Sequence, residues 1–204
     1  MVNTARFAKK GSGAEPLTVA VEGVIGVGKT TLAKAMADQL GAVRLFEEEI
    51  GNPFLPAFYK NRAKQAFVCQ AAFLAGRVDQ FSRDLPAGVP VVCDHHLLKD
   101  PLFARVNLAG DEWTLYQNLY RRMAPQAVFR PRVIVYLTAP LDEVRRRIRE
   151  RGRRMESGID LPYLKALVEA YETWFASEEA ARERTMSRRP RPGPSGRAGL
   201  CPTP

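Results

Sequence analysis

The chain has 204 residues, of which 46% are hydrophobic and 26% charged, values typical of one soluble domain with a substantial core. No apolar run approaches the roughly 20 residues that a membrane-spanning helix needs, so membrane insertion is excluded. The three cysteines have no C-x-x-C spacing, the two histidines are adjacent, and no secretory signal precedes them. A disulfide framework or a structural zinc site is therefore unsupported, and we expect a cytoplasmic protein.

The net charge of +9 lies mostly at the two ends of the chain. Residues 1–16 carry a net charge of +2 and residues 181–204 one of +5, which leaves +2 for the part between them. A nucleic-acid-binding surface needs basic residues clustered on the folded part, so we expect no dedicated nucleic-acid surface. The basic tail is still compatible with weak binding of polyanions.

In chain order, the predicted elements begin after an aperiodic stretch. Residues 1–16 are expected to form a flexible leader, with a transit peptide as the alternative. Strands are predicted at 17–22, 42–46, 89–94 and 132–137, and helices at 30–40, 53–83, 141–151, 161–179 and from the N-cap Asp111 to Met123. Prolines and glycines in 181–204 predict a disordered Pro/Arg-rich tail.

This alternation of strands and helices predicts the fold class. The strands are near-continuous apolar runs, which is typical of strands covered on both faces. The sequence therefore favours an α/β domain at 17–180, with a parallel sheet and helices on both of its faces.

A phosphate-binding loop follows the first strand. Residues 23–30, GVIGVGKT, match G-x-x-x-x-G-K-S/T and lead into a helix, as that motif requires. Glycines let backbone N–H groups surround phosphate oxygens, while the lysine reaches the β- and γ-phosphates and the threonine binds Mg²⁺. The alternative is a glycine-rich turn without a ligand. The residues predicted to hold the nucleoside triphosphate are Gly23, Gly26, Val27, Gly28, Lys29, Thr30 and Thr31. A kinase, a GTPase and a motor ATPase all fit this loop.

Three glutamates, Glu47 to Glu49, follow the second strand. Carboxylates at the carboxyl end of such a strand lie in the crevice where open α/β sheets bind ligands, and one of them could take a proton from an attacking hydroxyl. An acidic turn in solvent would look the same.

Several separated motifs then resemble the deoxynucleoside kinase family, in particular its bacterial deoxyadenosine and deoxyguanosine kinases. They are the GNPFLPAFY segment at 51–59, FVCQAAFLAGR at 67–77, DHHLLKD at 94–100 and RIRERGRRMES at 147–157. The resemblance covers about residues 17–177. It implies a P-loop kinase-like fold and ATP-dependent phosphorylation of a deoxynucleoside at its 5′-hydroxyl, in nucleotide salvage.

The resemblance also assigns roles to individual residues. Glu47 would be the general base, Tyr59 and Glu156 would contact the sugar, and Gln70 would pair with the base edge. Asp94 would lie beside the phosphates and Mg²⁺ with Thr30. Arg77 with Asp100 favours a purine or deoxycytidine over thymidine. An Arg-rich lid at about 147–158 would place Arg147, Arg151 and Arg153 on the phosphates. A homodimer is implied by the same resemblance.

Two departures from the family pattern leave alternatives open. His95 stands where many members have an arginine that holds the base glutamate, and the Pro/Arg-rich tail replaces the family's last strand and helix. We therefore expect the C-terminal edge strand to be missing and the adenine site to be weaker. The alternatives are a nucleoside monophosphate kinase of the thymidylate kinase type, although its "REP" segment is absent, and a truncated nucleotide-binding protein with little catalysis.

Overall fold

Four parallel strands form the sheet, in the order β2-β3-β1-β4. They are β1 (Thr18–Glu22), β2 (Val43–Leu45), β3 (Val91–Cys93) and β4 (Val133–Tyr136). Thr18 is in register with Val91, and Val19 with Val133. The structure is a computed structural model that describes residues 15–177, apart from the side chain of Ser157. All four predicted strands are present within these residues, each slightly shorter than expected.

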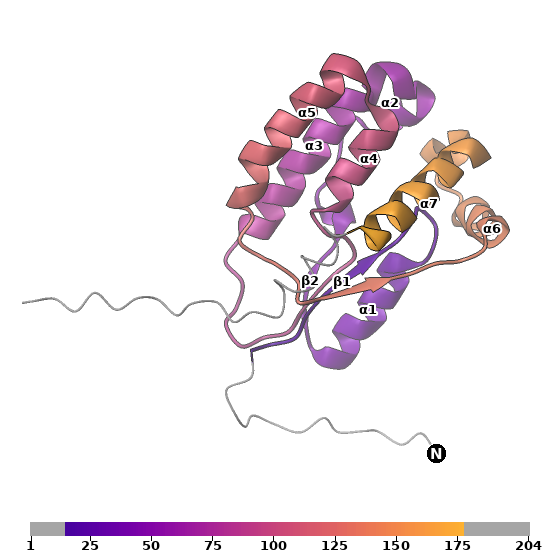
Figure 1. Cartoon of the computed structure of the whole chain (residues 1–204). Helices are drawn as coiled ribbons and strands as arrows, with labels where there is room; N and C mark the ends of the chain where they lie inside the picture. Colours follow the sequence, from indigo (N-terminus) through magenta and orange to yellow (C-terminus); the bar gives the residue numbers. More distant parts are fainter. Residues whose placement is uncertain (1–14, 178–204) are drawn as a thin grey trace, which may run out of the picture.

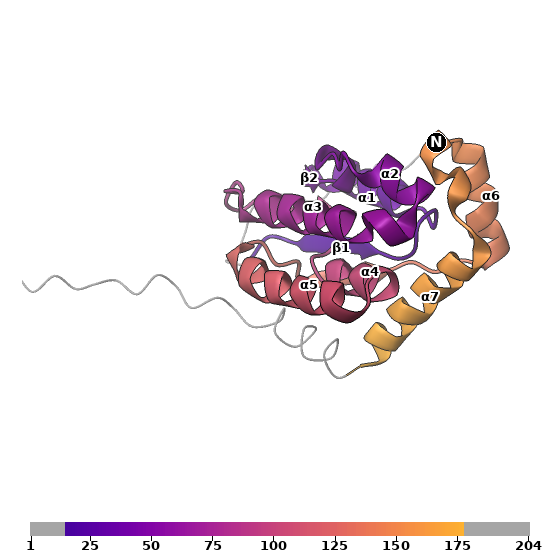
Figure 2. The same cartoon turned by 90° about the horizontal axis from the view of Figure 1, so that it is seen from above.

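Helices cover both faces of this sheet, which confirms the predicted α/β class (Figure 1). One face carries α1, and the opposite face carries α3, α4, α5 and α7; Figure 2 shows α6 beside α7 at one side of the sheet. The helices are α1 (Lys29–Leu40), α2 (Leu55–Lys60), α3 (Arg62–Ser82), α4 (Lys99–Asn107), α5 (Gly110–Met123), α6 (Leu141–Arg151) and α7 (Leu161–Ala176), with short 3-10 turns η1 (Glu47–Glu49), η2 (Ala124–Gln126) and η3 (Arg154–Gly158).

The pleat of the strands divides the core into two layers. Val21 and Val92 face Ala33 and Ala37 of α1, whereas Ala20 and its neighbours on the other face belong to the larger cluster under α3, α4, α5 and α7. Successive side chains in a strand point to opposite faces, so a run of apolar residues supplies both layers.

The structure corrects three of the predicted helix assignments. The predicted helix at 53–83 is two helices, because Asn61 lies between them in a non-helical conformation and caps α3 through the N–H of Lys64. Asp111 is not the N-cap of α5: Ala109 holds that position and Asp111 lies in the first turn. Helix α4 was not predicted at all, and it starts directly at the edge of the site described below.

Strand β4 is less covered than predicted. Val133 is 42% exposed and the other three residues are half-buried, because β4 is paired only with β1 among the residues that the structure describes. On one face Tyr136 stacks against Tyr171 and Phe175 of α7. The predicted loss of a C-terminal edge strand and the predicted disordered tail concern residues 178–204, and the predicted flexible leader concerns mainly residues 1–14. Both ranges lie outside the described part.

Between residues 15 and 177, the helices are all too short or too polar to cross a lipid bilayer.

Candidate active site

The phosphate-binding loop runs from the end of β1 into α1 and depends on its glycines. Gly23 has φ 145° and Gly26 has φ 81°, values that residues with a side chain rarely adopt. A Cβ on Gly26 would lie 2.6 Å from Cγ1 of Ile148, and one on Gly23 would lie 2.5 Å from the carbonyl oxygen of Leu137. The Ile148 side chain of α6 and the backbone of Leu137, just after β4, thus approach the loop too closely for a residue with a side chain.

Lys29 is the first residue of α1, and its ammonium group is buried in the loop. Nζ donates hydrogen bonds to the carbonyl oxygens of Gly23 (2.9 Å) and Val24 (3.1 Å). Burial, and secondarily the positive charge of Lys99, lower the pKa of Lys29 to about 8. The nearby carboxylates of Glu22, Glu47 and Asp94 do not fully offset this burial, so a bound phosphate would add the missing negative charge.

ATP affinity should therefore fall as the pH rises above about 8. Free Lys29 loses its proton in this range, whereas the anionic triphosphate restores the ordinary pKa, so binding at pH 9 takes up a proton. We expect the affinity to fall by up to about tenfold per pH unit between pH 8 and 9.5. Calorimetry in buffers of different ionisation enthalpy measures both the affinity and the proton uptake. Lys29→Met should bind ATP weakly and without this pH dependence. Lys34→Met, which removes an exposed lysine of the same helix, should retain the pH dependence. Equal affinity at pH 7 and pH 9 in the unmodified protein would contradict the role of Lys29 in the pH dependence.

Glu47 follows the end of β2 and opens η1. Its backbone N–H donates to Oδ1 of Asp94 at 2.8 Å, which joins the ends of β2 and β3. Its carboxylate accepts hydrogen bonds from Nζ of Lys99 (2.9 Å to Oε1 and 2.8 Å to Oε2) and from Nη2 of Arg77. Burial acts to raise the pKa of Glu47, but the charges of Lys99 and Arg77 outweigh it and hold that pKa well below its ordinary value. Glu47 is thus ionised across the neutral pH range.

Two side chains whose oxygens can bind a metal, Thr30 and Asp94, lie together beside the phosphate-binding loop. The hydroxyl of Thr30 donates to Oδ2 of Asp94 at 2.5 Å. Burial acts to raise the pKa of Asp94, but hydrogen bonds from His95 and Thr30 lower it below its ordinary value. The part of the chain that the structure describes has no group of three or more His, Cys, Asp or Glu able to hold a metal. Thr30 and Asp94 suit Mg²⁺, which typically takes one or two protein oxygens and completes its shell with phosphates and water.

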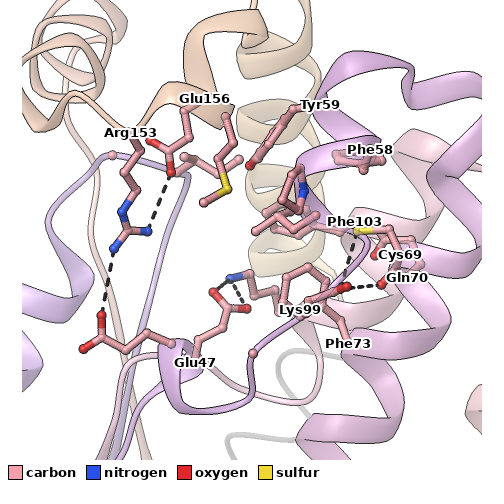
Figure 3. Close-up of a pocket in the computed structure, with 18 of the residues that line it drawn as sticks. Glu47, Phe58, Tyr59, Cys69, Gln70, Phe73, Lys99, Phe103, Arg153 and Glu156 are labelled. Carbon is pink, nitrogen blue, oxygen red and sulfur yellow. Dashed lines mark hydrogen bonds and ion pairs between the residues drawn. The ribbon is translucent and has the colours of Figure 1, made fainter.

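A cavity of about 590 Å³ opens over these residues, between the sheet edge, α2, α3, α4 and the lid (Figure 3). It brings together most of the residues that the sequence singled out: Lys29, Thr30, Glu47, Tyr59, Gln70, Arg77, Asp94, Arg151, Arg153 and Glu156. The base candidate Glu47 and the phosphate-loop lysine Lys29 thus face one space.

Arg77 connects the cavity to the buried end of α4. Nη2 contacts Glu47, Nη1 donates to Oδ1 of Asp100 at 2.5 Å, and the guanidinium lies 4.6 Å from the ring centre of Phe73. Arg77 is 2% exposed and Asp100 is fully buried. Asp100 does not line the cavity, so it acts on the cavity only through Arg77.

Gln70, two turns before Arg77 on α3, lines the cavity. The residue is 3% exposed, and its Oε1 has no hydrogen-bond partner. A buried amide oxygen without a partner is costly in free energy unless a ligand satisfies it. Tyr59 of α2 also lines the cavity, and burial raises its pKa far above the ordinary value, so its hydroxyl stays protonated and able to donate.

The arginines of the predicted lid line a second cavity of about 330 Å³ over the phosphate-binding loop. Arg147, Arg151 and Arg153 share it with Gly26, Gly28, Lys29, Thr30, Thr31 and Glu150. Val27 does not line it, but its carbonyl oxygen accepts a hydrogen bond from Arg147 at 2.7 Å. Arg147 thereby ties α6 to the loop.

Two of the lid arginines, Arg151 and Arg153, lie beside the carboxylate of Glu156. Nη2 of Arg151 lies 2.5 Å from Oε2 of Glu156, and the guanidinium of Arg153 lies between Glu156 (3.7 Å) and Glu48 (3.9 Å), as Figure 3 shows for Arg153. Glu156 is buried and lines the large cavity. The lid therefore has cations on the phosphate side and a carboxylate on the acceptor side.

Lys99 is a cavity residue that the sequence did not predict, and it bears on the question of what His95 does in place of the family arginine. His95 is fully buried, its ring stacks on Phe81 at 5.0 Å, and it does not line the large cavity. Lys99 occupies the cavity instead and carries the positive charge beside Glu47. The only signal in the sequence was a lysine five residues after Asp94, which points to the site only once α4 is recognised as a helix.

This geometry, with a phosphate-binding loop, a nearby carboxylate and an arginine-rich lid around one cavity, is that of a P-loop kinase with a small-molecule acceptor. The sequence pattern that defines deoxynucleoside kinases matches residues 19–188. Deoxyguanosine kinase of Bacillus subtilis (strain 168) is 34% identical over 173 residues, which cover 82% of this chain and 83% of the relative. Deoxyadenosine/deoxycytidine kinase of the same organism is 31% identical, covering 79% and 78%.

Solved structures agree with the sequence relatives. Deoxyadenosine kinase from M. mycoides with bound dATP superposes with a TM-score of 0.71 and 25% identity, covering 81% of this chain and 86% of that one. The chain belongs to the deoxynucleoside kinase family, and it is an ATP-dependent kinase of deoxynucleosides. The thymidylate kinase alternative is not favoured.

Proposed function

We propose that this kinase transfers the γ-phosphoryl group of ATP to the 5′-hydroxyl of a purine deoxynucleoside. The observation that carries this proposal is one cavity lined by Glu47, Lys29, Gln70 and Arg77, in which Arg77 contacts Glu47 and the buried Oε1 of Gln70 has no hydrogen-bond partner. A nucleoside placed with its base on α3 has its sugar between Tyr59 and Glu156 and its primary alcohol at Glu47.

In the proposed mechanism, Glu47 takes the proton of the 5′-hydroxyl as the sugar oxygen bonds to the γ-phosphorus. The bond from that phosphorus to the β,γ-bridging oxygen breaks, and ADP leaves with the electron pair. Lys29 and the lid arginines Arg147, Arg151 and Arg153 offset the negative charge that spreads over the transferred group. Because the phosphoryl transition state is loose, positioning and electrostatics supply most of the rate.

Mg²⁺ is proposed to be held by Thr30 and Asp94. The support is the pair of oxygen donors that already contact each other beside the phosphate-binding loop. When bound, the ion would neutralise charge on the β- and γ-phosphates.

The preference for a purine rests on the donors and acceptors at α3. The amide of Gln70 has a carbonyl oxygen that accepts and an NH₂ group that donates. This pair matches the adjacent donor and acceptor on the edge of adenine or guanine. Arg77 adds N–H groups that could donate hydrogen bonds to N7 of a purine or O6 of guanine. The relatives named above act on deoxyguanosine, deoxyadenosine and deoxycytidine.

Release of ADP with each of the four deoxynucleosides tests this function. We expect turnover with deoxyguanosine and deoxyadenosine, less with deoxycytidine and least with thymidine. Gln70→Leu should reduce kcat/KM for the preferred purine by about 10- to 100-fold, because a good base-edge pair contributes about 1–3 kcal/mol. Gln65→Leu, on the same helix but outside the cavity, is the matched control. Turnover with nucleoside monophosphates alone, or with no nucleoside, would overturn the proposal.

A homodimer in the cytoplasm is proposed as the working form. The support is two large apolar side chains on the outer surfaces of long helices: Val68 of α3 is 39% exposed and Leu115 of α5 is 50% exposed. A second copy would remove these side chains from water.

A further inference from the structure

Lys99 is a buried cation bound to the candidate base. It is 4% exposed, and its Nζ lies within 2.9 Å of both carboxylate oxygens of Glu47, as the dashed lines in Figure 3 show. The ammonium also lies 5.0 Å from the ring centre of Phe103, one turn further along α4. Of the cations around Glu47, Lys99 is the one whose hydrogen bonds reach both oxygens.

The second cation at Glu47 does not duplicate this contact. Arg77 contacts Oε1 only, and its other terminal nitrogen is engaged with Asp100. Among the described residues, Lys99 is the only hydrogen-bond donor to Oε2, so without it the carboxyl group would be free to rotate about its bond to the side chain. One donor fixes an oxygen; two fix the plane of the carboxylate.

The burial of Lys99 argues against a purely surface role. A lysine ammonium removed from water is unfavourable unless charges or hydrogen bonds compensate it, and the compensation here comes from Glu47. The charge faces the cavity that also holds Lys29 and Asp94. In this protein a cation beside Glu47 thus comes from the start of α4, while His95, directly after Asp94, is buried in the core and stacked on Phe81.

We propose that Lys99 is a positioning residue for catalysis, which holds the carboxylate of Glu47 in the orientation that receives the 5′-hydroxyl proton. This inference rests on the proposed function of Glu47. In this role Lys99 acts through Glu47, and it does not bind the nucleobase or the sugar.

Steady-state kinetics of Lys99→Met and Lys99→Arg test the inference. Lys99→Met should reduce kcat about 10- to 100-fold, which is less than the reduction expected when the general base Glu47 is replaced. KM for the nucleoside should change less than threefold. Lys99→Arg retains a cation and should recover most of kcat. The matched control is Arg105→Met, which removes an exposed cation from the same helix. A loss confined to KM, or no recovery with arginine in a folded variant, would overturn the proposal.

A double-mutant cycle with Glu47→Gln separates positioning from a merely structural role. If Lys99 acts through Glu47, Lys99→Met should reduce kcat less than threefold when Glu47 is already glutamine. Full additivity of the two losses would overturn the proposal. Where Lys99→Met does not fold, Lys99→Gln and Lys99→Arg complete the same cycle.

The unmodified enzyme distinguishes the two levels of failure. No turnover of any deoxynucleoside by the unmodified enzyme would reject the proposed function. Normal turnover that Lys99→Met leaves unchanged would reject the role of Lys99 alone.

Discussion

Replacing Glu47 with glutamine is expected to lower kcat by about 100- to 10,000-fold, the contribution that a general base usually makes. Glutamine keeps one carbonyl oxygen to accept from Lys99 and Arg77, so the local geometry is largely preserved, but it cannot take the 5′-hydroxyl proton. KM for the nucleoside should change little, because the nucleobase is proposed to pair with Gln70 and not with Glu47.

The control for this prediction lies in the same turn. Glu49→Gln removes an exposed carboxylate two residues away that does not line the cavity, and it should leave kcat unchanged. Coupled ADP release measures both variants, and near-ultraviolet circular dichroism establishes that they are folded. Equal kcat in Glu47→Gln and the unmodified enzyme would exclude Glu47 as the base.

Replacing Arg77 with methionine is expected to lower the free energy of unfolding by about 3–5 kcal/mol, because a buried charge loses its partner. Asp100 is fully buried, and its Oδ1 is bonded to Arg77 and, at 3.4 Å, to the hydroxyl of Tyr116. Burial already raises the pKa of Asp100 above its ordinary value even with Arg77 beside it. Without Arg77 this carboxylate must take up a proton or draw water into the core.

Urea unfolding measures the loss, and two variants define its cause. Arg77→Met combined with Asp100→Leu should regain at least half of the stability, since an apolar pair can replace a buried ion pair. Arg83→Met removes an exposed i,i+4 partner of Asp79 on the same helix and should leave the urea midpoint unchanged. If Arg77→Met were as stable as Arg83→Met, the buried network would not contribute to stability.

The arrangement of this network explains why the sequence identified some site residues and missed others. The phosphate-binding loop is contiguous, so the spacing of its glycines and Lys29 specifies it directly. Glu47 and Asp94 each follow a parallel strand, and the carboxyl ends of such strands meet at one edge of the sheet. For these residues, position in the chain already implied position in space.

Lys99 and the details of the lid could not be obtained in this way. The segment Lys99-Asp100-Pro101 has the composition of a turn, yet α4 begins there, because a proline is tolerated in the first turn, where the backbone N–H has no partner within the helix. Likewise, the sequence does not show that His95 points into the core or that Arg77 bonds two carboxylates at once.

By itself, then, the amino-acid sequence determined the parallel α/β sheet, the triphosphate loop and the kind of kinase, because local spacing and hydrophobic pattern carry that information. The tertiary structure decided which cations surround Glu47, which carboxylate supports Arg77, and how far β4 is covered. These contacts join α3, α4 and the strand ends across tens of residues, and only the packing of helices on the sheet sets the distances between them.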